Sequence, residues 1–138
     1  MTGDILNPLR LQQSECEGDQ SELALDPAPL RLLGELDRDG SGRILKLAIE
    51  KFLAHGAVAL AAMDSAAAAG DGAELLRHVH SMKSSSASLG AMALSGQCQA
   101  IEREIRGGRL PGEIMAALAR LQTLFRAAEQ ALWAVQQG

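Results

Sequence analysis

Hydrophobic residues recur every three to four positions along most of the chain after residue 24, which is the period of an amphipathic helix. The pattern predicts a short helix that begins at Asp26-Pro27 and ends near Leu36, followed by four long helices over about 41–69, 73–88, 92–106 and 110–136. Glycines separate the long segments, and Pro111 fits the first turn of the last one. Long helices with short connections predict an all-α fold, an up-down antiparallel four-helix bundle with a short additional N-terminal helix.

The first 24 residues lack this period and differ in charge from the rest. Residues 1–24 carry five acidic residues and one arginine, so they hold all of the formal net charge of −4. A polar, acidic segment without periodic apolar residues is typical of a tail or linker. We therefore expect an acidic flexible tail or linker over 1–24 and one helical domain over 25–138, a length that suffices for a core of its own.

Composition excludes several classes of protein. Aromatic residues make up only 2% of the chain, which argues against a β-sandwich or barrel, and there is no basic excess for nucleic acid. The longest apolar run, 57–63, is too short for a membrane span, and no signal-peptide pattern begins the chain. Two cysteines, Cys16 and Cys98, cannot form a disulfide framework. We expect a cytoplasmic monomer that neither binds nucleic acid nor inserts into a membrane.

A local conflict marks residues 80–91, which read HSMKSSSASLGA. Five of the eight residues over 81–88 are serine, a mediocre helix former, although the surrounding pattern is strongly helical. A broken local rule is expected at a functional site. The apolar stripe of this helix is expected to face the core through Leu75, Val79, Met82, Ser86 and Leu89.

His80 lies at the edge of that stripe and has a distinctive set of helical neighbours. Three residues share its ridge at spacings of three or four, namely Arg77, Lys83 and Ser84. A cation ~4 Å from a phosphoryl group interacts with each unit of its charge by about 4 kcal/mol at an effective dielectric of ~20. An imidazole flanked by cations and a small residue therefore suits phosphorylation.

Glu102 is the expected partner of the His80 ring. Both residues lie 11 positions from Ala91, in the turn between two antiparallel helices, so they stand at the same height. A carboxylate bonded to one ring nitrogen fixes the tautomer and leaves the other nitrogen as the nucleophile. The alternative for Glu102 is an ordinary helical ion pair with Arg106.

These residues resemble a known signature. The stretch 80–91 is similar to the pattern His-x-Leu-Lys-Gly-Ser-Ser-x-x-Leu-Gly-Ala of the histidine-containing phosphotransfer (HPt) domains of two-component phosphorelays. The resemblance covers about 25–136 and implies a helical bundle with the histidine on a central helix. It implies that His80 accepts a phosphoryl group, that Lys83 assists this group, and that Glu102 matches the position where the family places a Gln or Glu that bonds the imidazole.

Other residues of the stretch complete the resemblance or depart from it. Gly90 matches the turn glycine, and Ser85 and Ser86 match the structural serines of the signature. Met82 replaces the usual Leu, which is a conservative change in a core. Ser84 replaces the common Gly and adds a hydroxyl beside the imidazole.

The resemblance implies a phosphocarrier without kinase activity of its own. The chain lacks a Walker loop and a kinase-type glycine loop. The implied role is to accept a phosphoryl group on His80 from a receiver-domain aspartate and to pass it to, or back from, a response-regulator receiver aspartate. Mg²⁺ would come with the receiver, and no cofactor is expected on this chain. The chain is then a free-standing protein or the C-terminal, cytoplasmic domain of a hybrid sensor histidine kinase.

Partner contact is expected around His80. An apolar rim beside a polar site is a common partner surface, although its apolar members would alternatively complete the core. The apolar candidates for this rim are Leu76, Met82 and Ala87, with parts of the 41–69 helix. The polar candidates for partner contact are Arg77 and Ser84. The alternative function is a non-catalytic helical module that docks on a receiver domain or another protein.

Two patterns resemble metal sites but lack ligands. Residues 37–48 match the front of an EF-hand calcium loop, but the last position, normally glutamate, is alanine. We expect an interhelical turn there, with Asp39 or Ser41 as the cap of the next helix. Glu74 and His78 are four residues apart on one helix, and two ligands are too few for zinc. No metal site is expected.

Overall fold

Five α-helices and one 3₁₀ helix make up most of the residues that the computed structural model describes, 25–37 and 39–137. They are α2 (Pro27–Glu35), α3 (Arg43–Ala68), α4 (Gly72–Ser88), α5 (Met92–Arg106), η1 (Pro111–Ile114) and α6 (Met115–Gln137). No strand occurs in the two ranges, so the all-α prediction is confirmed. The predicted acidic tail, 1–24, lies outside the described residues.

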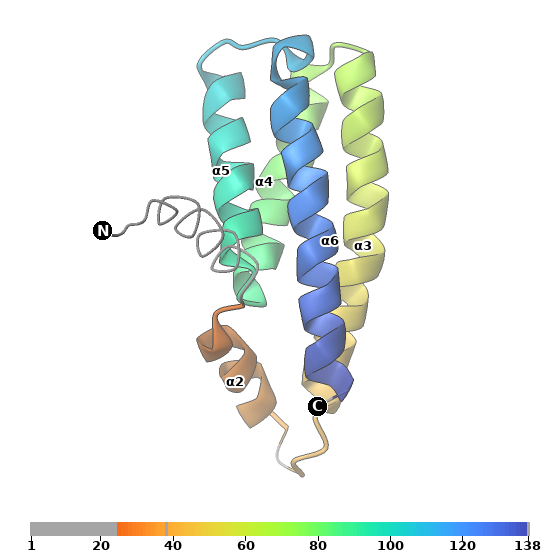
Figure 1. The fold of residues 1–138 in the computed structure, drawn as a ribbon, viewed down its shortest axis with the longest axis vertical. Helices are drawn as coiled ribbons and strands as arrows, with labels where there is room; N and C mark the ends of the chain where they lie inside the picture. The colour runs from red at the N-terminus through yellow and green to blue at the C-terminus, as the bar shows by residue number, and fades with distance from the viewer. Residues whose placement is uncertain (1–24, 38, 138) are drawn as a thin grey trace, which may run out of the picture.

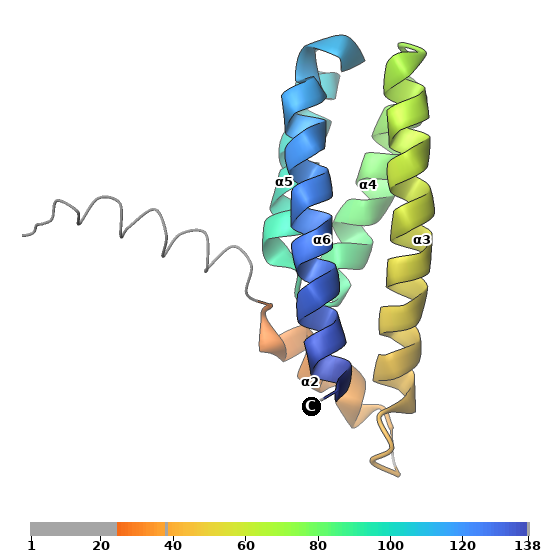
Figure 2. The same ribbon diagram turned by 45° about the vertical axis from the view of Figure 1, so that its right-hand side comes forward.

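The four long helices lie side by side, successive helices run in opposite directions, and α2 lies beyond the lower ends of α4 and α5, at the height of the first turns of α3 (Figure 1). In the rotated view, α4 and α5 stand behind α3 and α6 (Figure 2). In the described part of the chain, no helix is both long enough and apolar enough to cross a membrane.

The core lies between the long helices and takes aliphatic side chains from each. Its fully buried members include Ile49, Met63, Leu75, Val79, Leu94, Ile101, Leu121 and Leu132. Burying each such side chain contributes about 1.5–3 kcal/mol. The rings of Phe52 and Phe125 pack with centroids 5.6 Å apart. Helix α3 continues through Gly56, where the Phe125 ring occupies the space that a Cβ would need. Gly56 therefore permits close packing of α6 on α3.

The first residues of α3 and α6 differ from the sequence prediction. Helix α3 begins at Arg43 after Gly42, and three upstream side chains accept backbone N–H groups, two of which belong to its first turn. Asp37 accepts from Ile44 at 2.8 Å, Asp39 from Ser41 at 3.0 Å and Ser41 from Arg43 at 3.3 Å. The first turn of the last helix is the 3₁₀ segment η1, so α6 itself begins at Met115.

The start of α2 is fastened to the turn between α4 and α5. The Asp26 N–H donates to the Gly90 carbonyl at 2.8 Å, and the Asp26 side chain caps α2 by accepting from Ala28 at 3.1 Å. Gly90 has a φ of 80°, and the Asp26 backbone lies where a Cβ of residue 90 would project. A glycine at this turn is therefore required both by the left-handed backbone and by the close approach of α2.

Candidate functional site

Helix α4 accommodates its serines by turning their hydroxyls back onto the helix. Ser85 donates to the Ser81 carbonyl at 2.7 Å, Ser86 to the Met82 carbonyl at 2.6 Å and Ser88 to the Ser84 carbonyl at 3.0 Å. Such bonds satisfy the hydroxyls without breaking the backbone ladder. The serine-rich stretch therefore remains helical up to Ser88.

The predicted core stripe of α4 is confirmed, since all five of its members are buried: Leu75, Val79, Met82, Ser86 and Leu89. Met82 is only 3% exposed, so its inclusion in an exposed rim is wrong. His80 points away from this stripe, and its side chain is 58% exposed. Helix α4 thus packs one face against the core and exposes the His80 ring to solvent.

The His80 ring meets Glu102 across the α4–α5 pair. Glu102 Oε2 lies 2.8 Å from His80 Nδ1, and the Glu102 side chain is only 6% exposed. Because a carboxylate only accepts hydrogen bonds, Nδ1 is the protonated nitrogen in this contact and Nε2 of the neutral ring keeps its lone pair. The arrangement leaves one nucleophilic nitrogen on an accessible ring.

Two cations also bind the Glu102 carboxylate. Lys83 Nζ lies 2.6 Å from Oε1, and Arg106 Nη2 lies 2.9 Å from Oε2. Hydrogen bonds from Lys83, Arg106 and His80, in that order of effect, lower the pKa of Glu102 to about 2. The residue is therefore ionised at neutral pH. The expected contact with His80 and the alternative helical pair with Arg106 occur together.

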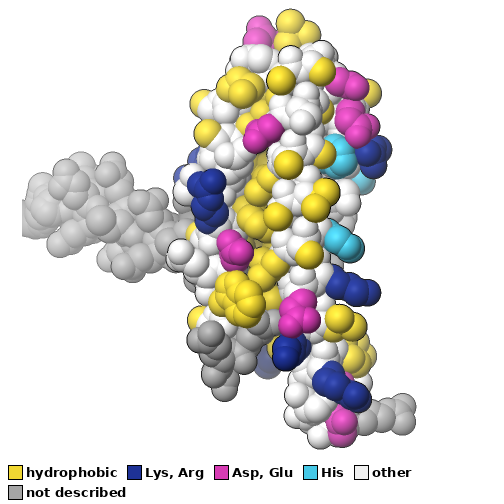
Figure 3. All heavy atoms as spheres, turned by 90° about the vertical axis from the view of Figure 1, so that its right-hand side faces the viewer, with side chains coloured by type: hydrophobic (Ala, Val, Ile, Leu, Met, Phe, Trp, Pro, Cys, Tyr) yellow, Lys and Arg dark blue, Asp and Glu magenta, His cyan; other side chains and the backbone are white. Residues whose placement is uncertain are grey.

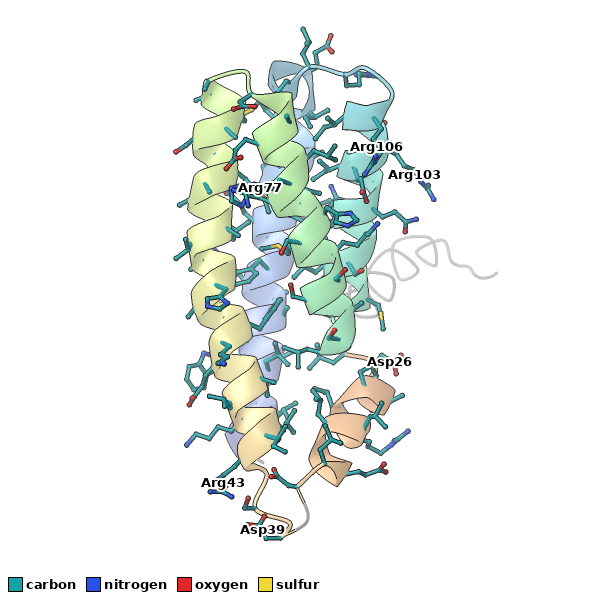
Figure 4. The ribbon with its side chains drawn as sticks, turned by 180° about the vertical axis from the view of Figure 1, so that it is seen from behind. Asp26, Asp39, Arg43, Arg77, Arg103 and Arg106 are labelled. Atoms are coloured by element: carbon teal, nitrogen blue, oxygen red, sulfur yellow. The ribbon has the colours of Figure 1, made fainter. Side chains whose placement is uncertain are left out.

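Arg77 takes a different partner from the one that its spacing suggested. Its Nε and Nη2 donate to the Glu74 oxygens at 3.1 and 2.6 Å, and His78 Nε2 lies 2.9 Å from Glu74 Oε2. Figure 4 shows Arg77 on the α3-facing side of α4, whereas Arg103 and Arg106 extend from α5. In the part of the chain that the structure describes, no group of three or more His, Cys, Asp or Glu side chains could hold a metal ion.

The other candidates for partner contact lie on α4, the helix that carries His80. Ser84 is exposed, and Leu76 and Ala87 are partly buried. Sequence reasoning missed Ser95, whose hydroxyl donates to the Lys83 carbonyl at 2.9 Å and so ties α5 to the segment that carries the lysine. A serine one turn into a facing helix carries no recognisable sequence signal for such a bond.

A cavity of about 340 Å³ lies between α3 and α4, on the side of Ser81 and Ser85. Its apolar lining includes Leu33, Phe52, Met82 and Leu89, and Lys51 and His55 contribute its basic groups. In the face that Figure 3 shows, histidine and basic side chains gather along one edge. Helix α4, which carries the exposed His80 ring, is therefore flanked by a cavity with a mainly apolar lining.

The Hpt domain family model matches residues 48–132, which is more than half of the chain. This chain therefore belongs to the Hpt domain family. Its structure is similar to that of histidine-containing phosphotransfer protein B from Pseudomonas aeruginosa PAO1, with a TM-score of 0.70 and 25% sequence identity over 82% of this chain and 94% of the other. No curated protein sequence matches the chain. Both matches support a histidine phosphotransfer role in two-component signalling.

Proposed function

We propose that the chain is a phosphorelay intermediate that accepts a phosphoryl group on Nε2 of His80 from a receiver-domain aspartate and passes it to, or back from, a response-regulator receiver aspartate. The observation that carries the proposal is the 2.8 Å contact between His80 Nδ1 and Glu102 Oε2 on a ring that is 58% exposed. This contact supports a fixed tautomer with a free lone pair on the accessible nitrogen.

In the proposed transfer, the Nε2 lone pair forms the N–P bond while the O–P bond of the aspartyl phosphate breaks, and the aspartate leaves as a carboxylate. The proton stays on Nδ1, where the Glu102 carboxylate balances the positive charge that develops on the ring. Lys83 follows His80 by three residues on α4, a spacing that suits neutralisation of the phosphoryl charge. Mg²⁺ bound by the receiver would neutralise charge on the aspartate side.

The rest of the chain serves this role as a scaffold and a docking face. We infer an up-down antiparallel four-helix bundle to which α2 adds a short N-terminal helix, a carrier that has no kinase activity of its own and needs no cofactor. Receivers would dock on the rim around His80, with Ser84, Leu76 and Ala87 as contacts.

Phosphoramidate, a small phosphoryl donor, tests the acceptor without a partner. We expect ³¹P NMR to show one Nε2-phosphohistidine in the wild type, and the same signal in the control variants His55→Gln and His78→Gln. The signal should be lost in His80→Gln. A signal that persists in His80→Gln would overturn the assignment of the acceptor.

A receiver domain charged with acetyl [³²P]phosphate in the presence of Mg²⁺ tests the relay itself. We expect acid-labile, alkali-stable label to move from the receiver to the wild-type chain and not to His80→Gln. A stable complex with the charged receiver that leaves the wild-type chain unlabelled would instead identify a non-catalytic docking module.

A further inference from the structure

The Glu102 carboxylate receives its two cations on different oxygens and from different helices. Lys83 of α4 binds Oε1 at 2.6 Å. Arg106 of α5 binds Oε2 at 2.9 Å, which is the oxygen that also accepts the His80 Nδ1–H at 2.8 Å. Arg106 therefore acts on the same oxygen as the imidazole, whereas Lys83 acts on the other one.

This division matters because the proposed function requires Lys83 for a second task. A lysine that moves to neutralise a phosphoryl group on Nε2 can no longer hold Oε1 of Glu102. The Glu102 side chain is only 6% exposed, so water cannot fully replace the lost ammonium group. A second cation must then keep the carboxylate charged and directed at the ring.

Arg106 meets this requirement by its place on the helix. It lies one turn after Glu102 on α5, so the contact is set by helix geometry and does not depend on α4. Its side chain is 60% exposed, so it is not needed for packing of the core. Arg103, three residues earlier on the same helix, is also exposed and is not among the groups bound to Glu102.

We propose that Arg106 is a positioning residue of the phosphotransfer site, which keeps Glu102 ionised and its Oε2 directed at His80 Nδ1 while Lys83 serves the phosphoryl group. The inference rests on the proposed function of His80. Arg106 does not contact the reacting atoms in this role, and it acts only through Glu102.

The first test is the tautomer of His80 in the unphosphorylated protein with Lys83→Ala, which deprives Glu102 of its ammonium partner as the transfer itself would, read from ¹⁵N NMR of the imidazole. We expect Nδ1–H to dominate in Lys83→Ala alone and with the control change Arg103→Ala added. Adding Arg106→Ala should shift the population toward Nε2–H, the form that a free imidazole prefers, and Arg106→Lys in its place should keep most of the Nδ1–H population because it keeps the charge.

The second test is the lifetime of the phosphohistidine and its rate of formation from phosphoramidate. We expect Arg106→Ala to slow formation or shorten the lifetime by about tenfold, with Arg103→Ala unchanged. In a Glu102→Gln background, Arg106→Ala should have no further effect, because the residue acts through that carboxylate.

Three results separate the possibilities. Identical tautomers and lifetimes in Arg106→Ala and Arg103→Ala would overturn the positioning role. So would a loss confined to the receiver concentration needed for half-maximal transfer, since that would make Arg106 a docking residue. If phosphoramidate fails to modify wild-type His80, the proposed function fails, whereas the tautomer measurement still tests the contact between Arg106 and Glu102.

Discussion

Arg77 and Glu74 form a two-point ion pair within α4, with Nε–Oε1 at 3.1 Å and Nη2–Oε2 at 2.6 Å. The pair holds the guanidinium on the side of α4 that faces α3 (Figure 4). The cations bound to Glu102, beside the His80 ring, are instead Lys83 and Arg106. Arg77 and Lys83 both lie within one helical turn of His80. Arg77 is engaged in a separate ion pair with Glu74, whereas Lys83 binds the same carboxylate as the His80 ring.

We expect Arg77→Ala and Lys83→Ala to differ strongly in phosphotransfer. Loss of Arg77 removes an exposed ion pair, a class of contact worth about 0–1 kcal/mol, so the initial rate of transfer from a charged receiver should change by less than about twofold. Loss of Lys83 removes a cation from the phosphoryl site and should slow transfer by about tenfold or more. Equal losses in the two variants would show that Arg77 also serves the phosphoryl group.

Replacement of Glu102 should damage the chemistry and leave the fold intact. Glu102→Ala removes the acceptor of the Nδ1–H bond, so we expect slower phosphorylation of His80 or faster loss of phosphate. Initial rates and the decay of labelled protein measure the two effects, and circular dichroism checks the helices. An unchanged rate in both directions would contradict the role that we propose for Glu102.

Ser84 stands where the family signature has glycine, and its side chain is exposed on α4, four residues after His80. We expect Ser84→Gly to transfer phosphate as fast as the wild type or faster, because it opens space near Nε2. Ser84→Ala is the matched control, since it removes the hydroxyl but keeps the Cβ. A tenfold loss in both variants would mean that the hydroxyl contributes to transfer.

The acid stability of the fold should depend on two carboxylates. Arg77 and then His78 lower the pKa of Glu74 to about 2, and Lys83, Arg106 and His80 do the same for Glu102. A carboxylate whose pKa is lower in the folded state stabilises the fold above its unfolded pKa, and this contribution is lost as the pH falls through the folded value.

We therefore expect wild-type stability to decline between about pH 5 and about pH 2, and the decline to be shallower in Glu74→Gln and Glu102→Gln. Midpoints of urea unfolding across this window measure the effect. Glu113→Gln is the control, since it replaces an exposed glutamate of η1. Parallel declines in all four proteins would contradict the assignment of these ion pairs as sources of acid sensitivity.

Two helical glycines should respond in opposite ways to alanine. In Gly56→Ala the new methyl group meets the Phe125 ring, so we expect a loss of about 1–3 kcal/mol in the free energy of unfolding. Gly96 of α5 is exposed with open space at its Cβ position, so Gly96→Ala should gain about 0.5–1 kcal/mol from helix propensity. Urea unfolding of both variants measures the difference, and a gain for Gly56→Ala would contradict the close packing of α6 on α3.

The sequence was sufficient to pair His80 with Glu102 because α4 and α5 are joined by one short turn. Each residue of a helix advances about 1.5 Å, so equal distances from the turn give equal heights on the two helices. The core stripe of α4 was predictable for the same reason, since burial of Leu75, Val79 and Met82 follows helical periodicity. The constant rise and period of an α-helix make such predictions possible over long segments.

Side chains with several rotatable bonds and loops without a period could not be predicted in this way. The ridge of His80 offered Arg77 more than one possible partner, and helical spacing does not decide that competition. The start of α3 depends on how a glycine-rich loop folds back, so the bond from Ile44 to Asp37, seven residues earlier, has no periodic signal. Gly56 suggested no partner either, because the Phe125 ring that fills its place comes from a distant helix.

The inward hydrogen bonds of the exposed Ser85 and Ser88 have a consequence for any protein that covers α4. A hydroxyl that already donates to its own helix loses little when water is stripped from it. This side of α4 therefore offers a surface of small polar side chains whose desolvation costs little free energy. A partner can bind there and leave again without either surface having to form new hydrogen bonds, which would suit the proposed relay, in which one receiver replaces another.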